Sequence, residues 1–283
     1  MTRESRTTLA FIALAYCVTW LLWIPLLLES FHLHHFGRSL PIFGLAGSFG
    51  PSFAAVLLTR RCTGRWMPSP LFPPGRHRRI VAILVPSALI FLGFIVLPLA
   101  VSTEPIHLRL TWATFASLAA LWPNILSGPL GEEAGWRGFL QPRLSKSVGP
   151  TLAALLTGLV WSLWHLPLFF VRGWEHPRWW IFVLVLSAAS VILAYGFNLS
   201  GGSILAAILG HFTLNQIEGI LRALGDTIGH PILHQDRILP GSVAITAVVL
   251  IVATKGRLAD TKARTLRCAH DTIKGQNEKG ASR

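Results

Sequence analysis

Charged residues are scarce in this chain. Only 13% of its 283 residues are Asp, Glu, Lys or Arg, against roughly 25% in a typical soluble protein. Apolar types make up 52% of the residues, and the mean hydropathy is +0.55. A soluble globular protein cannot cover its surface with so little charge. The composition therefore excludes that class and predicts a protein that crosses a membrane several times.

Cysteine is scarce as well. Cys17, Cys62 and Cys268 lie far apart and share no CxxC spacing, which argues against a disulfide framework and against a thiolate zinc site. The net charge of +13 comes from basic residues that lie between apolar runs and do not gather on one face. This distribution argues against a nucleic-acid partner.

Long apolar runs fill most of the sequence. A helix needs about 20 apolar residues to cross a bilayer, and eight stretches approach this length, two of which contain one histidine each. They run at 9–28, 40–58, 80–101, 110–131, 148–171, 179–197, 199–217 and 238–254. We therefore predict an all-α fold: a polytopic integral membrane helix bundle of about eight transmembrane helices. It forms a single domain over residues 1–254, with the lipid bilayer as its surroundings.

The basic residues between these runs predict the orientation of the bundle. With an even number of spans, both termini lie on one side, where 18 lysines and arginines fall against 6 on the other. The positive-inside rule places that side in the cytoplasm, and we expect a bacterial plasma membrane. The polar, basic segment 255–283 is expected to be a disordered tail that anchors on anionic lipid.

Few ionisable groups fall within or at the ends of the spans. Such groups are costly in a bilayer and usually functional. They are Glu132, Glu133, Arg137, His165 and His211, joined by the amide of Asn215, which we expect to be buried.

The spacing of these residues along the chain predicts which side chains can interact. Glu133 and Arg137 are four residues apart, so they can form an ion pair on one helix face. Glu132 is rotated by about 100° from Glu133 and can point toward the bundle interior. It has no cation spaced to neutralise it. A purely structural ion pair is the alternative interpretation for Glu133 and Arg137.

Two further helices supply the remaining polar groups. His211 and Asn215 are also four residues apart, and His165 comes from another span. A carboxylate, two imidazoles and an amide can activate a water and stabilise an oxyanion. Glu132, His165 and His211 could equally hold a zinc ion. Taken singly, His165 could be a core hydrogen-bond donor and Asn215 an interhelical contact.

Three patterns follow one another along the chain: Glu132-Glu133-x-x-x-Arg137, Trp161-x-x-x-His165 and His211-x-x-x-Asn215. They resemble the motifs of the CPBP intramembrane proteases, a group that includes CAAX prenyl endopeptidases and the Abi bacteriocin-processing or immunity proteins. The resemblance covers about residues 110–217, and Trp161 stands where the family more often has Phe. The resemblance implies that Glu133 and Arg137 form a supporting pair.

The resemblance also implies an all-helical protease whose site lies below the membrane surface. Glu132 with His165 would activate the attacking water, and His211 with Asn215 would hold the water or stabilise the oxyanion. The motifs are compatible with zinc and with glutamate–histidine chemistry alone. The implied substrate is a membrane-associated peptide or protein, either a prenylated CAAX chain or one that bears a leader.

Two other functions use the same residue types. A transporter also places Glu and His inside the membrane, but the sequence has no inverted repeat and no paired broken helices. A scaffold or immunity protein could bind a peptide in the same cavity without cleaving it.

Overall fold

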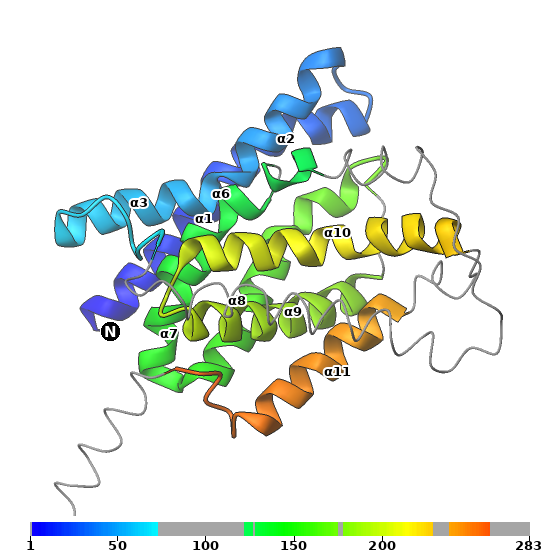
Figure 1. Ribbon diagram of the computed structural model, residues 1–283. Helices are drawn as coiled ribbons and strands as arrows, with labels where there is room; N and C mark the ends of the chain where they lie inside the picture. The colour runs from blue at the N-terminus through cyan, green and yellow to red at the C-terminus, as the bar shows by residue number, and fades with distance from the viewer. Residues whose placement is uncertain (1, 73–121, 127, 175–177, 229–237, 261–283) are drawn as a thin grey trace, which may run out of the picture.

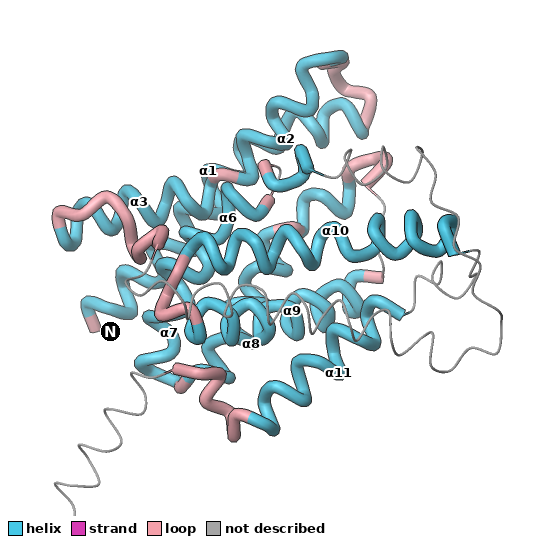
Figure 2. The backbone as a smooth tube through the Cα atoms, viewed as in Figure 1, coloured by secondary structure: helices cyan, strands magenta, loops and turns pink. Residues whose placement is uncertain are grey.

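The computed structural model describes residues 2–72, 122–126, 128–174, 178–228 and 238–260. Within these ranges the chain forms helices joined by turns and loops, and no strand (Figure 2). The predicted all-α membrane fold is therefore confirmed. Residues 73–121 lie outside the described ranges, and with them the predicted span 80–101 and half of 110–131.

The first two spans form a pair of packed segments. Helix α1 (Arg3–Ser30) is continuous, whereas the second segment is divided into α2 (Leu40–Ser48) and α3 (Gly50–Thr63). Pro51 lies in the first turn of α3, where a missing backbone N–H costs no helical hydrogen bond. Both α2 and α3 pack against α1 (Figure 1).

The remaining helices build the second part of the bundle. They are α6 (Pro129–Gly135), a π-helix (Trp136–Leu140), α7 (Gln141–Val148), α8 (Pro150–Trp164), α9 (Trp179–Leu199), α10 (Ile204–Ile228) and α11 (Ile238–Ala253). Helix α8 packs against α9, and α9 also contacts α10 and α11 (Figure 1). Helix α6 lies between α3 and α10.

Four segments of the described chain are long and apolar enough to cross a membrane. They are Arg3–Ser30, Gly37–Thr63, Pro150–Phe170 and Trp179–Leu199. Gly241–Ala253 is a shorter apolar helix. The protein is a membrane protein, while the count of eight spans, the cytoplasmic termini and the bacterial membrane stay predictions.

Two predicted spans have different limits in the structure. The end of 110–131 is not one helix, because a 3₁₀ turn (Trp122–Ile125) precedes α6, which begins only at Pro129. The span predicted at 199–217 begins at Ile204, after a turn in which Gly201 and Gly202 have positive φ angles. Glycine adopts that conformation without a steric penalty. The apolar pattern alone does not mark these breaks.

Glycines bring α6 close to the junction of α2 and α3. A Cβ atom on Gly131 would lie 2.6 Å from the carbonyl oxygen of Ser48, and one on Gly135 would lie 2.6 Å from Cβ of Pro51. Larger side chains would push the helices apart. This close approach fixes the position of the helix that carries Glu132 and Glu133.

The start of the predicted tail is packed against the bundle. Leu258 is fully buried, and its carbonyl accepts a hydrogen bond from Asn198 Nδ2 at 3.0 Å. Thr151 Oγ1 donates to the carbonyl of Gly256 at 2.7 Å. Residues 255–260 therefore join the ends of α8 and α9, and the rest of the predicted tail lies outside the described residues.

Candidate active site

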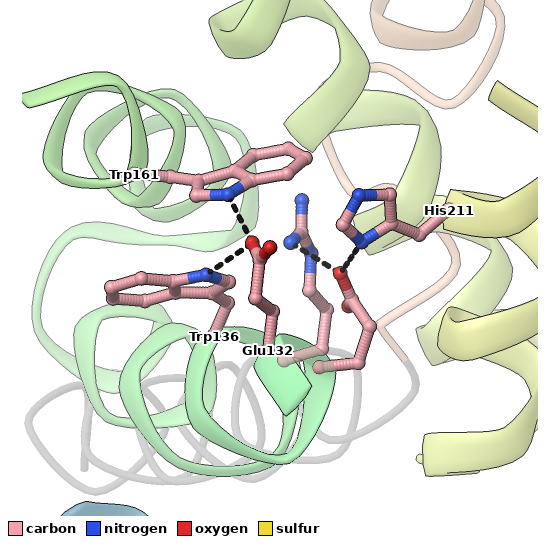
Figure 3. A network of polar contacts seen from close by, with 6 residues as sticks. Glu132, Trp136, Trp161 and His211 are labelled. Carbon is pink, nitrogen blue, oxygen red and sulfur yellow. Dashed lines mark hydrogen bonds and ion pairs between the residues drawn. The ribbon is translucent and has the colours of Figure 1, made fainter. Parts of the chain in front are cut away.

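Glu132 lies in the first turn of α6 with only 3% of its surface exposed. Its Oε2 accepts hydrogen bonds from two indoles, Trp161 Nε1 at 2.5 Å and Trp136 Nε1 at 3.2 Å (Figure 3). Hydrogen bonds to an ionised carboxylate are stronger than neutral ones. The two indoles therefore stabilise a buried carboxylate that has no cation four residues away.

The other carboxylate oxygen of Glu132 lies close to Gly128. A Cβ atom on Gly128 would be 3.1 Å from Glu132 Oε1, 3.6 Å from Asn215 Nδ2 and 3.8 Å from His211 Cε1. Atoms of three side chains from α6 and α10 therefore lie within 4 Å of the position that a Cβ atom of residue 128 would occupy, which we call the space beside Gly128. Three of the four predicted catalytic residues meet there.

Asn215 differs from its prediction in one respect. The sequence predicts a buried amide, but the side chain is exposed, whereas His211 one turn earlier is buried. The prediction of burial was wrong. The Asn215 amide lies beside Gly128, the residue that precedes α6.

Glu133 connects two of the motifs. Its Oε1 accepts a hydrogen bond from Arg137 Nη1 at 3.0 Å and lies 2.8 Å from His211 Nδ1. All three side chains are buried. Because an ionised carboxylate can only accept, the His211 Nδ1 carries the proton and its Nε2 is left to face other groups. Glu133 therefore orients His211 as well as pairing with Arg137.

Trp161 contacts three ionisable groups of the site: Glu132, Arg137 and His211. Its ring lies under the Arg137 guanidinium, with 4.7 Å between Cζ and the ring centroid. Its ring also meets His211 edge-on, with 4.9 Å between centroids. Together with the hydrogen bond to Glu132, these contacts place Trp161 between the charged side chains of the site (Figure 3).

His165 lies at the end of α8, one turn after Trp161. Its Nδ1 is 2.8 Å from the Trp161 carbonyl oxygen, so Nδ1 donates and Nε2 is an acceptor in the neutral ring. The imidazole packs against Trp164, Trp174 and Phe182. Although Glu132 and His165 are both described, no hydrogen bond joins them, and His165 borders the site through Trp161, at 6.0 Å between ring centroids.

The zinc site predicted at Glu132, His165 and His211 is not tested by the structure. Across the ranges that the structure describes, no three His, Cys, Asp or Glu side chains are placed to hold a metal ion. Nδ1 of His165 and Nδ1 of His211 are both engaged with oxygen acceptors. Zinc binding by these three side chains stays a prediction.

Two contributors to the site were missed from sequence. Trp136 is not among the residues predicted from sequence, although it lies four positions after Glu132 and so on the same helix face. Gly128 was not considered. The signal that could have identified Gly128 is a Gly-Pro pair at the start of a helix, four residues before a carboxylate that is expected inside the membrane.

This geometry defines the class of the protein: a polytopic helical membrane protein with a buried carboxylate–imidazole site. Residues 113–217 match the family described as type II CAAX prenyl endopeptidase Rce1-like. The chain is 32% identical over 104 residues to CAAX prenyl protease 2 of Methanococcus maripaludis, with 34% of this chain and 38% of that protein covered. The predicted resemblance to the CPBP proteases is thereby confirmed for this part of the chain, which spans well under half of the relative.

Proposed function

We propose that this protein is an intramembrane endopeptidase that hydrolyses a peptide bond of a membrane-associated peptide or protein. The observation that carries the proposal is the convergence of Glu132 Oε1, His211 and Asn215 on the space beside Gly128. The family match supplies the reaction class. The printed name of the relative refers to prenyl proteins, which makes a prenylated chain the first substrate to test.

Glu132 acts as the general base of the proposed reaction. Its Oε1 takes a proton from a water molecule, and the water oxygen forms a bond to the peptide carbonyl carbon. Oε2 stays bound to the two indoles, so the carboxylate keeps its orientation. His165 Nε2, an acceptor in the neutral ring, is the second group that can orient the water or hold a proton.

His211 and Asn215 stabilise the negative charge that develops on the carbonyl oxygen. The Asn215 amide can donate an N–H, and His211 can donate from Nε2 once that nitrogen is protonated. Glu133 accepts a hydrogen bond from His211 Nδ1 and so holds the ring with Nε2 turned away from Glu133.

Collapse of the tetrahedral intermediate completes the reaction. The carbonyl double bond forms again, the carbon–nitrogen bond breaks, and the proton on Glu132 passes to the leaving amine. The products are a new carboxyl terminus and a new amino terminus. Because Oε2 of Glu132 is held by two indoles, Oε1 keeps one position and can act there first as a base and then as an acid.

The test compares substrates on the purified full-length protein in lipid nanodiscs. The probes are a farnesylated CAAX peptide, the same peptide without lipid, and a lipid-anchored leader peptide, with products identified by mass spectrometry. We expect cleavage of a membrane-anchored probe and slower cleavage of the free peptide. Binding without any product would favour a non-catalytic scaffold, and solute uptake into proteoliposomes without cleavage would favour a transporter. Either result would overturn the proposal.

A further inference from the structure

The indole of Trp161 holds a distinctive place in the site. It is 4% exposed, donates to Glu132 Oε2, lies under the Arg137 guanidinium and meets the His211 ring. The face and the edge of its ring could be provided by any aromatic residue. The N–H that reaches Glu132 is specific to tryptophan.

The hydrogen bond to Oε2 has a geometric consequence for Oε1. The terminal torsion of a glutamate side chain is broad and roughly two-fold, so an unanchored carboxylate can rotate and exchange its oxygens. Two donors on one oxygen restrict that rotation, and Trp161 is the closer at 2.5 Å against 3.2 Å for Trp136. The other oxygen then stays beside Gly128, near His211 and Asn215.

We propose that Trp161 is a positioning residue for Glu132: its indole N–H holds Oε2 so that Oε1 faces the space beside Gly128. Its effect on turnover rests on the proposed protease function, whereas the hydrogen bond itself does not. Trp161→Phe removes the donor and keeps a ring against Arg137 and His211. The loss is therefore confined to the anchoring of the carboxylate and to a small change in volume.

Trp164 offers a matched control on the same helix. It is also fully buried, but among the residues that the structure describes its Nε1 has no hydrogen-bond partner. Trp164→Phe therefore makes the same change in side-chain volume without removing a bond to Glu132. Comparison of the two variants separates the role of the N–H from the cost of a smaller side chain.

The kinetic experiment measures kcat and KM on a membrane-anchored peptide for the wild type and both variants. A charge-assisted hydrogen bond that positions the base acts on the chemical step, so Trp161→Phe should lower kcat about tenfold or more with KM within twofold. Trp164→Phe should keep kcat within about threefold. Equal kcat in Trp161→Phe and Trp164→Phe would overturn the positioning role while leaving the protease function intact.

A spectroscopic experiment tests the hydrogen bond without an activity measurement, by changing its acceptor, Glu132. In protein labelled with ¹⁵N at the 11 tryptophans, the indole signal of Trp161 is assigned by its disappearance in Trp161→Phe, or by selective labelling if that variant folds poorly. We expect this proton far downfield of the Trp164 indole, and an upfield shift in Glu132→Gln. A Trp161 signal that is unchanged in Glu132→Gln would overturn the proposal, even where the wild type cleaves no peptide.

Discussion

His211 Nδ1 lies 2.8 Å from Glu133 Oε1, across 78 positions of the sequence and between two helices, α10 and α6. The same oxygen is 3.0 Å from Arg137 Nη1. One carboxylate therefore balances a buried guanidinium and fixes the orientation of an imidazole next to the reacting groups. The adjacent residue, Glu132, is left to face the space beside Gly128.

Arg137→Ala should chiefly destabilise the fold. It leaves Glu133 as a buried carboxylate without its cation, and loss of one partner of a buried pair typically costs about 3–5 kcal/mol. Thermal unfolding and folded yield in detergent measure the effect, with the exposed Arg65→Ala as the control that should change little. Adding Glu133→Gln to Arg137→Ala should recover part of the loss, and equal stability of Arg137→Ala and wild type would contradict the prediction.

Gly128→Ala should inhibit turnover. The added methyl group would lie 3.1 Å from Glu132 Oε1, in the space that we assign to the reacting groups. We expect kcat/KM to fall at least tenfold in the peptide cleavage assay. Gly241→Ala is the matched control, because nothing lies within 4 Å of its added Cβ. Wild-type kcat/KM in Gly128→Ala would show that the reaction occurs elsewhere.

Gly135→Ala should separate α6 from α3. Its Cβ would lie 2.6 Å from Cβ of Pro51 and 2.7 Å from the Pro51 carbonyl oxygen, closer than folded proteins tolerate. Overpacking of this kind typically costs about 1–3 kcal/mol. The measurement is the thermal unfolding midpoint in detergent, again beside Gly241→Ala. An unchanged midpoint in Gly135→Ala would mean that the helices are not held in this close contact.

Removal of metal ions should leave the activity in place. The proposed base, Glu132, is oriented by two indoles, and no group of three metal-ligand side chains occurs in the described parts of the chain. Cleavage rates are measured after exhaustive chelation and after titration with zinc, with elemental analysis of the same samples. Loss of activity on chelation with recovery on zinc would instead support the zinc site predicted from sequence.

Helical spacing predicts contacts within one helix and little beyond it. The pairing of Glu133 with Arg137 follows from their separation of four residues, and the three motifs identified the family resemblance. The contact of Glu133 with His211 depends on the register of α10 against α6, which is set by packing, including the close contacts of Gly131 and Gly135 with the α2–α3 junction. No local pattern encodes that register.

Trp161 shows a second limit of what the sequence alone can predict. In the sequence it stands where related proteins more often have Phe, which suggests only that an aromatic ring is kept. In the structure the indole N–H is a donor to Glu132. The partner lies 29 positions away on another helix, so the chemical difference between Trp and Phe acquires meaning only once the two helices are placed.

The central claim, water attack promoted by Glu132, is tested most directly by cleavage in ¹⁸O-labelled water. Wild-type protein and Glu132→Gln are compared at equal folded yield, with the exposed Glu4→Gln as the isosteric control. We predict one ¹⁸O atom in the new carboxyl terminus of the product with wild type and Glu4→Gln, and no product above background with Glu132→Gln. Full formation of the labelled product by Glu132→Gln would contradict the mechanism.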